Sequence, residues 1–153
     1  MSSAVLAAIR PDSWNLPLFL HVLGAMILVG GLLAGASALA FARGEVRFLR
    51  LGYWALLAVA LPGWLMMFVG AEWIYRKEGL ADEPIESAWV LMGFLVAELG
   101  GVLLLVSLIL GGIGVYRLRR GTSTRLLRAT MAISLLLVAA NAVAVWAMTG
   151  KPG

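Results

Sequence analysis

The sequence predicts an all-α integral membrane protein built as a four-helix bundle. Its composition is 62% hydrophobic and only 13% charged, with a mean hydropathy of +0.97, whereas an average soluble domain carries about 25% charged residues. Four apolar stretches exceed the length of about 18 residues that marks a candidate membrane span. They are continuous, unlike the alternating segments of a membrane β-barrel. The chain has no cysteine, which excludes disulfides and thiolate metal sites.

The four predicted spans fill most of the 153 residues, which we interpret as a single transmembrane domain, 1–153. The spans cover residues 16–42, 51–71, 87–116 and 129–150. The first is far longer than the apolar core of a signal peptide, which has about 7–15 residues, so we expect it to be retained. The only acidic or basic side chains inside the spans are His21 and Glu98.

Charge predicts the orientation, because Lys and Arg in short loops stay on the cytoplasmic side. Arg43, Arg47 and Arg50 follow the first span and five more arginines follow the third, while residues 78–86 between the hairpins are acidic. We therefore expect both termini outside. The net charge of +4 comes from these loops, so the expected partner is the lipid bilayer and no nucleic acid. Tryptophans mark the predicted outer end of every span: Trp14, Trp73, Trp89 and Trp146.

The chain resembles itself at a shift of 77 residues. Gly24 then aligns with Gly101 and Gly35 with Gly112, and an Arg-Gly pair in each basic loop also coincides. This self-similarity predicts a duplicated two-helix hairpin, with a pseudo-two-fold axis along the membrane normal.

Small residues predict how the helices pack, because helices in lipid associate where their backbones approach closely. Three stripes follow helical spacing. They are His21, Gly24, Leu28, Gly31 and Gly35 on the first helix, Glu98, Gly101, Leu105, Leu108 and Gly112 on the third, and Ser134, Asn141 and Met148 on the fourth. Pro62, followed by Gly63, predicts a kink in the outer half of the second helix, because proline lacks an amide hydrogen.

His21, Glu98 and Asn141 fall in the outer half of the predicted bundle. A charge at mid-bilayer costs about 2.5–3.5 kcal/mol on insertion scales, so we expect these side chains to turn inward. One interpretation of His21 is a structural hydrogen bond to Glu98 or Asn141. The others are an axial ligand of haem b and a copper(I) site shared with thioethers. The methionines at similar depth are Met66, Met67, Met92 and Met148.

Two interpretations of Glu98 stay open. It is either a neutral acid that is hydrogen-bonded to His21 or to a backbone carbonyl, or a group that handles protons or binds a cation beside His21. Asn141 and Ser134 are expected to be structural polar residues between helices. We assign no catalytic residue and do not expect an enzyme, because HExxH, GxSxG and phosphate-loop motifs are missing from the sequence.

The segment Leu20-His21-Val22-Leu23-Gly24-Ala25, followed by Val29-Gly30-Gly31, resembles the first helix of copper-resistance protein D-like membrane proteins and their four-helix relatives. The likeness covers residues 16–70 and departs at Leu28, where an aromatic residue is common. It implies a prokaryotic inner-membrane protein connected with copper uptake or cytochrome-like functions, with His21 as ligand. The additional histidines of larger relatives do not occur in this chain.

These observations favour a small multi-pass membrane protein that binds haem or copper near its outer face through His21. One alternative is a structural or accessory subunit of a larger membrane complex, without a cofactor of its own. The other is a transporter or channel, which would work as a homodimer because four helices enclose little space.

Overall fold

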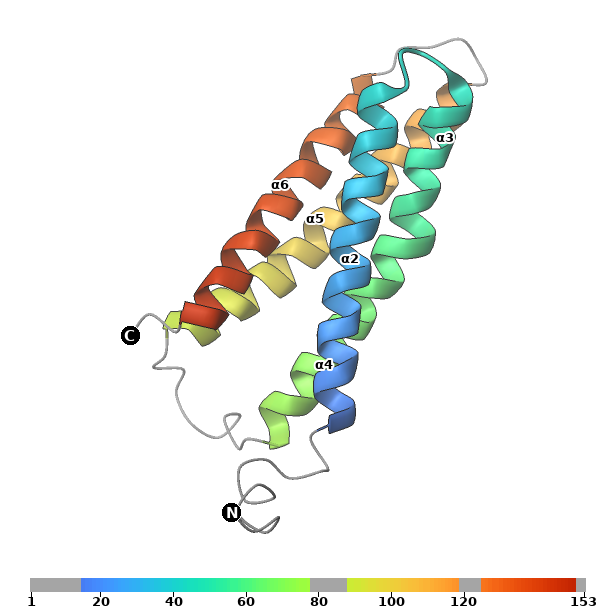
Figure 1. The fold of residues 1–153 in the computed structure, drawn as a ribbon. Coiled ribbons are helices and arrows are strands. Elements are labelled where there is room, and N and C mark those ends of the chain that lie inside the picture. The colour runs from blue at the N-terminus through green and yellow to red at the C-terminus, as the bar shows by residue number, and fades with distance from the viewer. Residues whose placement is uncertain (1–14, 78–87, 119–124, 151–153) are drawn as a thin grey trace, which may run out of the picture.

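The computed structural model describes residues 15–77, 88–118 and 125–150. Their regular structure is helical throughout, in the order α2 (Asn15–Phe41), α3 (Val46–Ala55), the π-helical segment η2 (Leu56–Ala60), α4 (Leu61–Lys77), α5 (Ala88–Leu118) and α6 (Arg125–Gly150). Because α3, η2 and α4 follow one another without a break, the fold is a bundle of four long helices (Figure 1). All four are long and apolar enough to cross a membrane. The prediction of an all-α four-helix bundle is confirmed, and the protein is of the multi-pass membrane type.

The second helix is longer than its predicted span. It runs from Val46 to Lys77, whereas the apolar run covers residues 51–71. The added turns carry charged side chains at both ends, including Arg47 and Arg76. A bilayer with its headgroups is about 40–45 Å thick but has a hydrocarbon core of only about 30 Å, so a helix continues beyond its apolar run. The predicted acidic connection and Trp14 lie outside the described residues.

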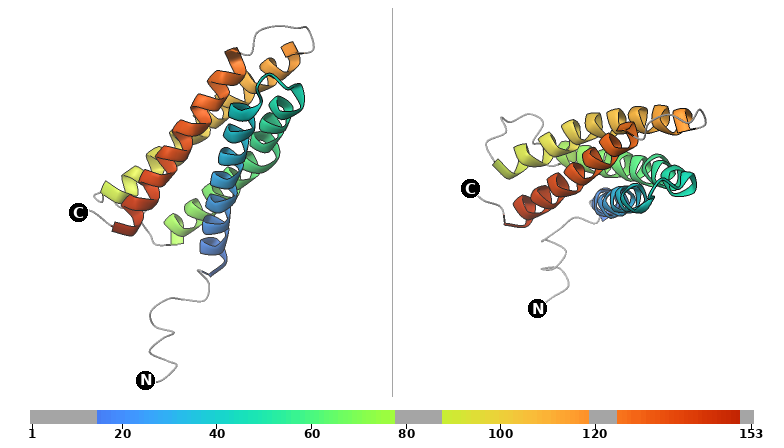
Figure 2. Two further views of the ribbon diagram at one scale, coloured as in Figure 1. Left: turned by 45° about the horizontal axis from the view of Figure 1, so that its top comes forward. Right: turned by 90° about the horizontal axis from the view of Figure 1, so that it is seen from above.

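The helices form two antiparallel hairpins. In the first, α2 packs along α3, η2 and α4, and in the second α5 packs along α6. The hairpins meet mainly where α2 crosses α6, with lighter contacts from α5 to α3 and α4. They lie close together at the end that holds the α2–α3 turn and diverge toward the other end (Figures 1 and 2). The divergence leaves space between the hairpins in one half of the bundle.

Glycines bring α2 and the second helix into backbone contact. A Cβ atom added to Gly31 would lie 2.5 Å from the Ala60 nitrogen, and one added to Gly70 would lie 2.5 Å from the His21 nitrogen. Gly24 likewise faces the backbone of Met67. The predicted stripe on the first helix is therefore confirmed, since Gly24, Leu28, Gly31 and Gly35 are all buried. The matching glycines of the second helix, at positions 52, 63 and 70, were not part of the prediction.

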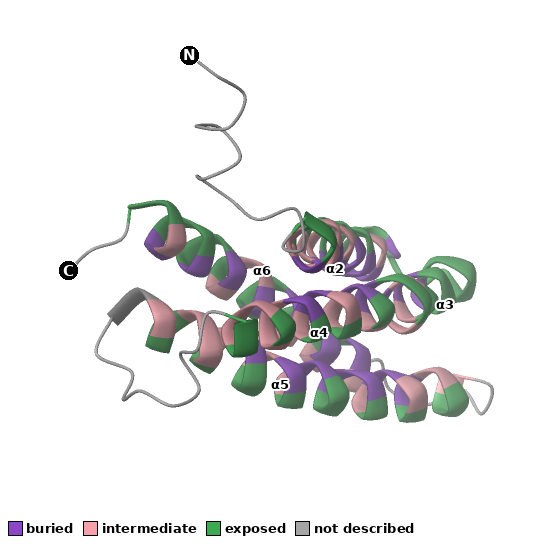
Figure 3. Ribbon diagram, turned by 90° about the horizontal axis from the view of Figure 1, so that it is seen from below, coloured by how far each residue is buried: buried purple, intermediate pink, exposed green. Residues whose placement is uncertain are grey.

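The predicted stripe on the third helix is confirmed at Gly101 and Leu108, which are buried, but wrong at Glu98 and Leu105. At those two positions the preceding residues, Ala97 and Leu104, face the interior, whereas Leu105 is 46% exposed. Glu98 is exposed as well. Adjacent residues on an α-helix point about 100° apart, since a turn takes 3.6 residues. The one-residue difference therefore turns Glu98 from the bundle interior to its outer surface. Figure 3 shows buried residues along one side of α5 and exposed residues along the other.

The distortion expected from Pro62 takes the form of a π-helical turn just before it. The Leu61 amide donates to the Leu56 carbonyl, five residues back. Proline cannot donate to the carbonyl four residues earlier, here that of Ala58, and its ring crowds that oxygen. Ala58 lies within η2, so the widened turn accommodates the proline without breaking the helix.

The halves of the predicted repeat pack differently. Gly24 meets the backbone of its own hairpin at Met67, but the aligned Gly101 meets the side chain of Trp64 from the other hairpin. Gly35 meets Leu56 of its own hairpin, whereas its aligned glycine, Gly112, meets Tyr53 of the other. The duplication stays a prediction from the sequence, and the aligned glycines do not share partners.

Candidate functional site

A cavity of about 300 Å³ lies between the hairpins where they diverge. All four helices line it. The lining side chains are mostly apolar, and four are polar: His21 from α2, Glu72 and Tyr75 from α4, and Asn141 from α6. Ligand pockets in proteins typically measure about 300–1,000 Å³ and combine apolar walls with a few polar groups. The cavity matches that description at its smaller end.

The cavity runs from the ends of the helices to the middle of the bundle. Tyr75 and Val90 lie in the terminal turns of α4 and α5, so the mouth is at the helix ends. Met67 and Asn141 are ten and nine residues from the ends of α4 and α6, which is about 14–15 Å at 1.5 Å per residue. The inner wall thus reaches roughly half the depth of a hydrocarbon core of about 30 Å.

His21 is half-buried and is fixed by a hydrogen bond within its own hairpin. Its Nδ1 lies 3.1 Å from the carbonyl oxygen of Met67. A carbonyl oxygen only accepts, so Nδ1 carries a proton, and in the neutral form of imidazole Nε2 is then the acceptor. His21 lines the cavity, and the described residues offer no partner for Nε2. The expected bond from His21 to Glu98 or Asn141 is wrong, because the nearby α4 backbone supplies the acceptor.

Asn141 also presents an acceptor in the cavity wall. Its Nδ2 donates to the Leu137 carbonyl oxygen at 2.8 Å, within α6. That bond leaves Oδ1 without a partner among the described residues, and the side chain, 8% exposed, lines the cavity. The expected role of Asn141 as a hydrogen bond between helices is therefore wrong, since its donor is used on its own helix.

Ser134 lies deeper in the bundle and does not reach the cavity. Its hydroxyl donates to the Thr130 carbonyl oxygen at 2.9 Å. The neighbouring Thr130 hydroxyl lies 3.0 Å from the Leu126 carbonyl oxygen and 3.3 Å from that of Ser107. The second of these contacts crosses from α6 to α5. Ser134 belongs to this buried polar cluster, which joins the two helices of the second hairpin.

The structure divides the four candidate methionines into two pairs. Met67 and Met148 line the cavity together with His21. Met66 and Met92 do not line it, and Met92 is 39% exposed on α5. The prediction that Ser134, Asn141 and Met148 share one face of α6 is confirmed, because Ser134 and Asn141 are buried and Met148 lies over Gly93 of α5.

Glu98 is not part of this site. It is exposed on α5, does not line the cavity, and makes no hydrogen bond or ion pair with any described residue. Both interpretations of Glu98 that place it beside His21 are therefore wrong. The cause is the one-residue offset of the α5 interior face, since Ala97, its neighbour, occupies the inward position.

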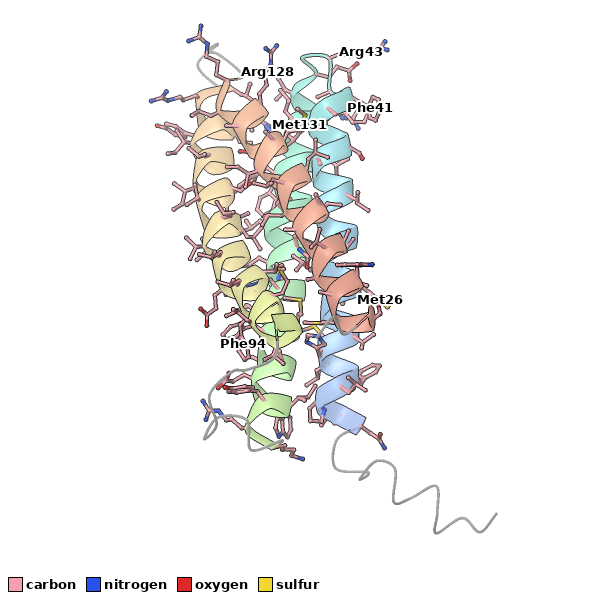
Figure 4. All side chains as sticks on the ribbon, turned by 90° about the vertical axis from the view of Figure 1, so that its left-hand side faces the viewer. Met26, Phe41, Arg43, Phe94, Arg128 and Met131 are labelled. Atoms are coloured by element: carbon pink, nitrogen blue, oxygen red, sulfur yellow. The ribbon has the colours of Figure 1, made fainter. Side chains whose placement is uncertain are left out.

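Several residues of the site were missed by the sequence analysis. Glu72 and Tyr75 lie just beyond the predicted span 51–71, and their spacing of three places both on one helical face. At the mouth, Glu72 accepts a 2.8 Å hydrogen bond from Arg76 Nε, and Tyr75 packs edge-on against Phe94 with ring centroids 4.8 Å apart. Phe94 is labelled on α5 in Figure 4. Trp64 donates from Nε1 to the Ala97 carbonyl oxygen at 2.9 Å and so links the hairpins below the cavity.

In the part of the chain that the structure describes, no group of three or more His, Cys, Asp or Glu side chains converges to hold a metal ion. No family model, curated protein or solved structure matches the chain. The resemblance to copper-resistance protein D-like proteins thus stays a prediction carried by residues 16–70.

Proposed function

We propose that this membrane protein binds a small lipophilic molecule with a hydroxyl or other donor group in the cavity between its hairpins. The observation that carries the proposal is the fixed imidazole of His21 in a mostly apolar wall. With Nδ1–H bonded to Met67, Nε2 is an acceptor, and Asn141 adds a second acceptor through Oδ1. A ligand that satisfies both must donate hydrogen bonds.

The shape and depth of the cavity fit such a ligand. Its volume of about 300 Å³ suits a small molecule, and apolar side chains such as Ala25 and Ala144 cover most of its wall. The apolar body of the ligand would replace lipid contacts, while its donor would meet His21. The polar mouth at Glu72 and Tyr75 gives access from the membrane surface.

The experiment compares an alkylphenol with its methyl ether, which has the same body but no donor. Binding to the purified protein is measured by calorimetry in one detergent. The phenol should bind about fivefold more tightly than the ether, which corresponds to one net hydrogen bond of about 1 kcal/mol. The variant His21→Leu should lose this preference. Met26→Leu is the control, because Met26 is 69% exposed on the same helix (Figure 4).

The phenol and the ether also partition differently into detergent. The quantity compared between wild type and His21→Leu is therefore the ratio of the two dissociation constants. Equal preference in both proteins would contradict the role of His21. Failure of both compounds to bind would favour the structural or accessory alternative, in which His21 only joins α2 to α4.

Copper(I) is a second candidate ligand, favoured by the two thioethers that line the cavity with His21. Imidazole and thioether groups are donors that Cu(I) prefers, and a histidine ligand commonly donates its other ring nitrogen to a carbonyl, as His21 does. His21, Met67 and Met148 would hold the ion. Copper retained after desalting under reducing conditions should fall in Met148→Leu but not in Met92→Leu, and equal retention in both variants would contradict this assignment.

Haem b fits less well than a single ion. A porphyrin is much bulkier than the ion, and the cavity is at the small end of the range for ligand pockets. His21 would be its axial ligand, with Met67 or Met148 as candidates for the sixth. A Soret band that is lost in His21→Leu would reinstate haem as the ligand.

A further inference from the structure

The outward face of α5 carries a regular seam of exposed side chains. Its members alternate at spacings of four and three residues, the repeat of a left-handed helix pair. They are Leu91, Leu95, Glu98, Val102, Leu105 and Ile109, all exposed. Apolar residues on this face need no explanation in a membrane helix, because lipid covers them. Glu98 is the one polar residue among them.

Glu98 lies deep in the apolar part of the helix. It is ten residues from Ala88, where α5 begins, which is about 15 Å at 1.5 Å per residue. The seam residues one turn away on either side, Leu95 and Val102, are apolar, and the described residues give Glu98 no hydrogen-bond or ion-pair partner. A carboxyl group facing hydrocarbon without a partner is strongly unfavourable, so such residues usually face a protein partner.

A second copy of the chain supplies a partner at the right depth. All copies insert in the same orientation, so a two-fold axis along the membrane normal sets α5 parallel to α5 and each seam residue opposite itself. A carboxylic acid contains both a donor and an acceptor, so two such groups can satisfy each other. Contact through any other helix would leave Glu98 in lipid.

We propose that two copies associate through the α5 seam, with the two Glu98 carboxyl groups hydrogen-bonded to each other. The proposal is independent of the ligand cavity, because Glu98 does not line it. It also agrees with the general use of single polar residues to fix the register of a helix pair.

The first test measures dimerisation of the full chain in dilute phosphatidylcholine vesicles by single-molecule photobleaching. Glu98→Leu should weaken the dimer about fivefold or more, in the range of interhelical hydrogen bonds in membranes. Glu98→Gln should retain most of it, since an amide also pairs with itself. Ser37→Leu, at an exposed polar position of α2, should have no effect.

The second test uses the natural absence of cysteine. Val102→Cys should form a cross-linked dimer on oxidation in membranes, whereas Val143→Cys, at a position 48% exposed on α6, should not. A wild-type chain that stays monomeric, equal dimerisation of Glu98→Leu and wild type, or equal cross-linking at both positions would overturn the proposal. Unfolding of the Glu98→Leu protein by dodecyl sulfate at the same detergent fraction as wild type verifies that it is folded.

Discussion

At the level of single residues, Trp64 joins the two hairpins about one helical turn further into the bundle than Met67, which lines the cavity. Its indole nitrogen donates to the Ala97 carbonyl across the gap between α4 and α5, its ring stacks on Phe68 at 5.5 Å, and it fills the space above Gly101. The side-chain hydrogen bonds of His21 and Thr130, by contrast, each stay within one hairpin. Trp64 therefore stabilises this interface both through packing and through a directional hydrogen bond.

Trp64→Phe should lower the free energy of unfolding by about 0.5–1 kcal/mol. The change keeps an aromatic ring but removes the donor, and net hydrogen bonds of this kind contribute about that amount. Unfolding by dodecyl sulfate in mixed micelles measures the difference. Trp73→Phe is the matched control, because Trp73 lies on the same helix and is 39% exposed. Equal loss in both variants would show that the bond to Ala97 is not the cause.

At the level of helices, the contact between α2 and the second helix depends on which glycine faces inward. Gly30 and Gly31 are neighbours in the middle of α2, but only Gly31 lies against Ala60. A methyl group at Gly31 would collide with backbone, which cannot rotate away as a side chain can. A methyl group at Gly30 would meet nothing within 4 Å.

Gly31→Ala should therefore destabilise the protein by about 1–3 kcal/mol, as is usual for overpacking. Gly30→Ala should be neutral or slightly stabilising, because alanine is the better helix former. Both variants replace glycine by alanine at adjacent positions of the same helix, so the difference in helix propensity between the two residue types cancels in the comparison. Dodecyl sulfate unfolding again provides the measurement. A similar effect of both changes would mean that α2 and η2 are not in contact at Gly31.

The same helices show how much the sequence can predict. The four helices and the α2 stripe followed from apolar length and glycine spacing, because backbones in lipid approach only at small residues. The α5 stripe was right at Gly101 and Leu108 but wrong at Glu98 and Leu105, because lipid and protein interior are both apolar and hydrophobic periodicity cannot tell one from the other. We expected Glu98 to face the bundle interior, whereas the adjacent Ala97 faces it. The repeat alignment with His21 reinforced that error.

The cavity could not be predicted from the sequence, because it results from the relative placement of the two hairpins. Residue counts predict the depth of His21, Met67 and Asn141 in the membrane. Whether the three side chains line one cavity depends on how far α4 and α5 diverge. The sequence equally gave no sign that the His21 acceptor would be the Met67 carbonyl, because any exposed helix backbone offers such oxygens.

At the level of the whole molecule, the two ends of the bundle differ in charge. Arg43 and Arg128 lie at the end where the hairpins are close (Figure 4). The opposite end, where the cavity opens, carries Glu72 paired with Arg76. The 27 residues of α2 extend about 40 Å at 1.5 Å per residue, which matches a bilayer with its headgroups. The two charged ends therefore fit opposite membrane surfaces.

The arginine-rich end should face the cytoplasm, because cationic loops are retained there during insertion. The chain has no cysteine, so single cysteines can report the side of the membrane without background. Thr149→Cys, exposed near the end of α6, should react with a membrane-impermeant maleimide in intact cells. Arg43→Cys and Arg128→Cys should react only after permeabilisation.

The labelling result also determines which compartment supplies the ligand. The cavity opens at the helix ends near Tyr75 and Val90, on the same side as Thr149, so labelling of Thr149→Cys from outside would place the mouth at the outer surface. The reverse pattern would contradict the orientation and open the cavity to the cytoplasm, where copper(I) is the stable oxidation state under reducing conditions. Because residues of all four helices line the cavity, inversion would change its source of ligand but not its internal contacts, and the preference for a hydrogen-bond donor at His21 should persist in either orientation.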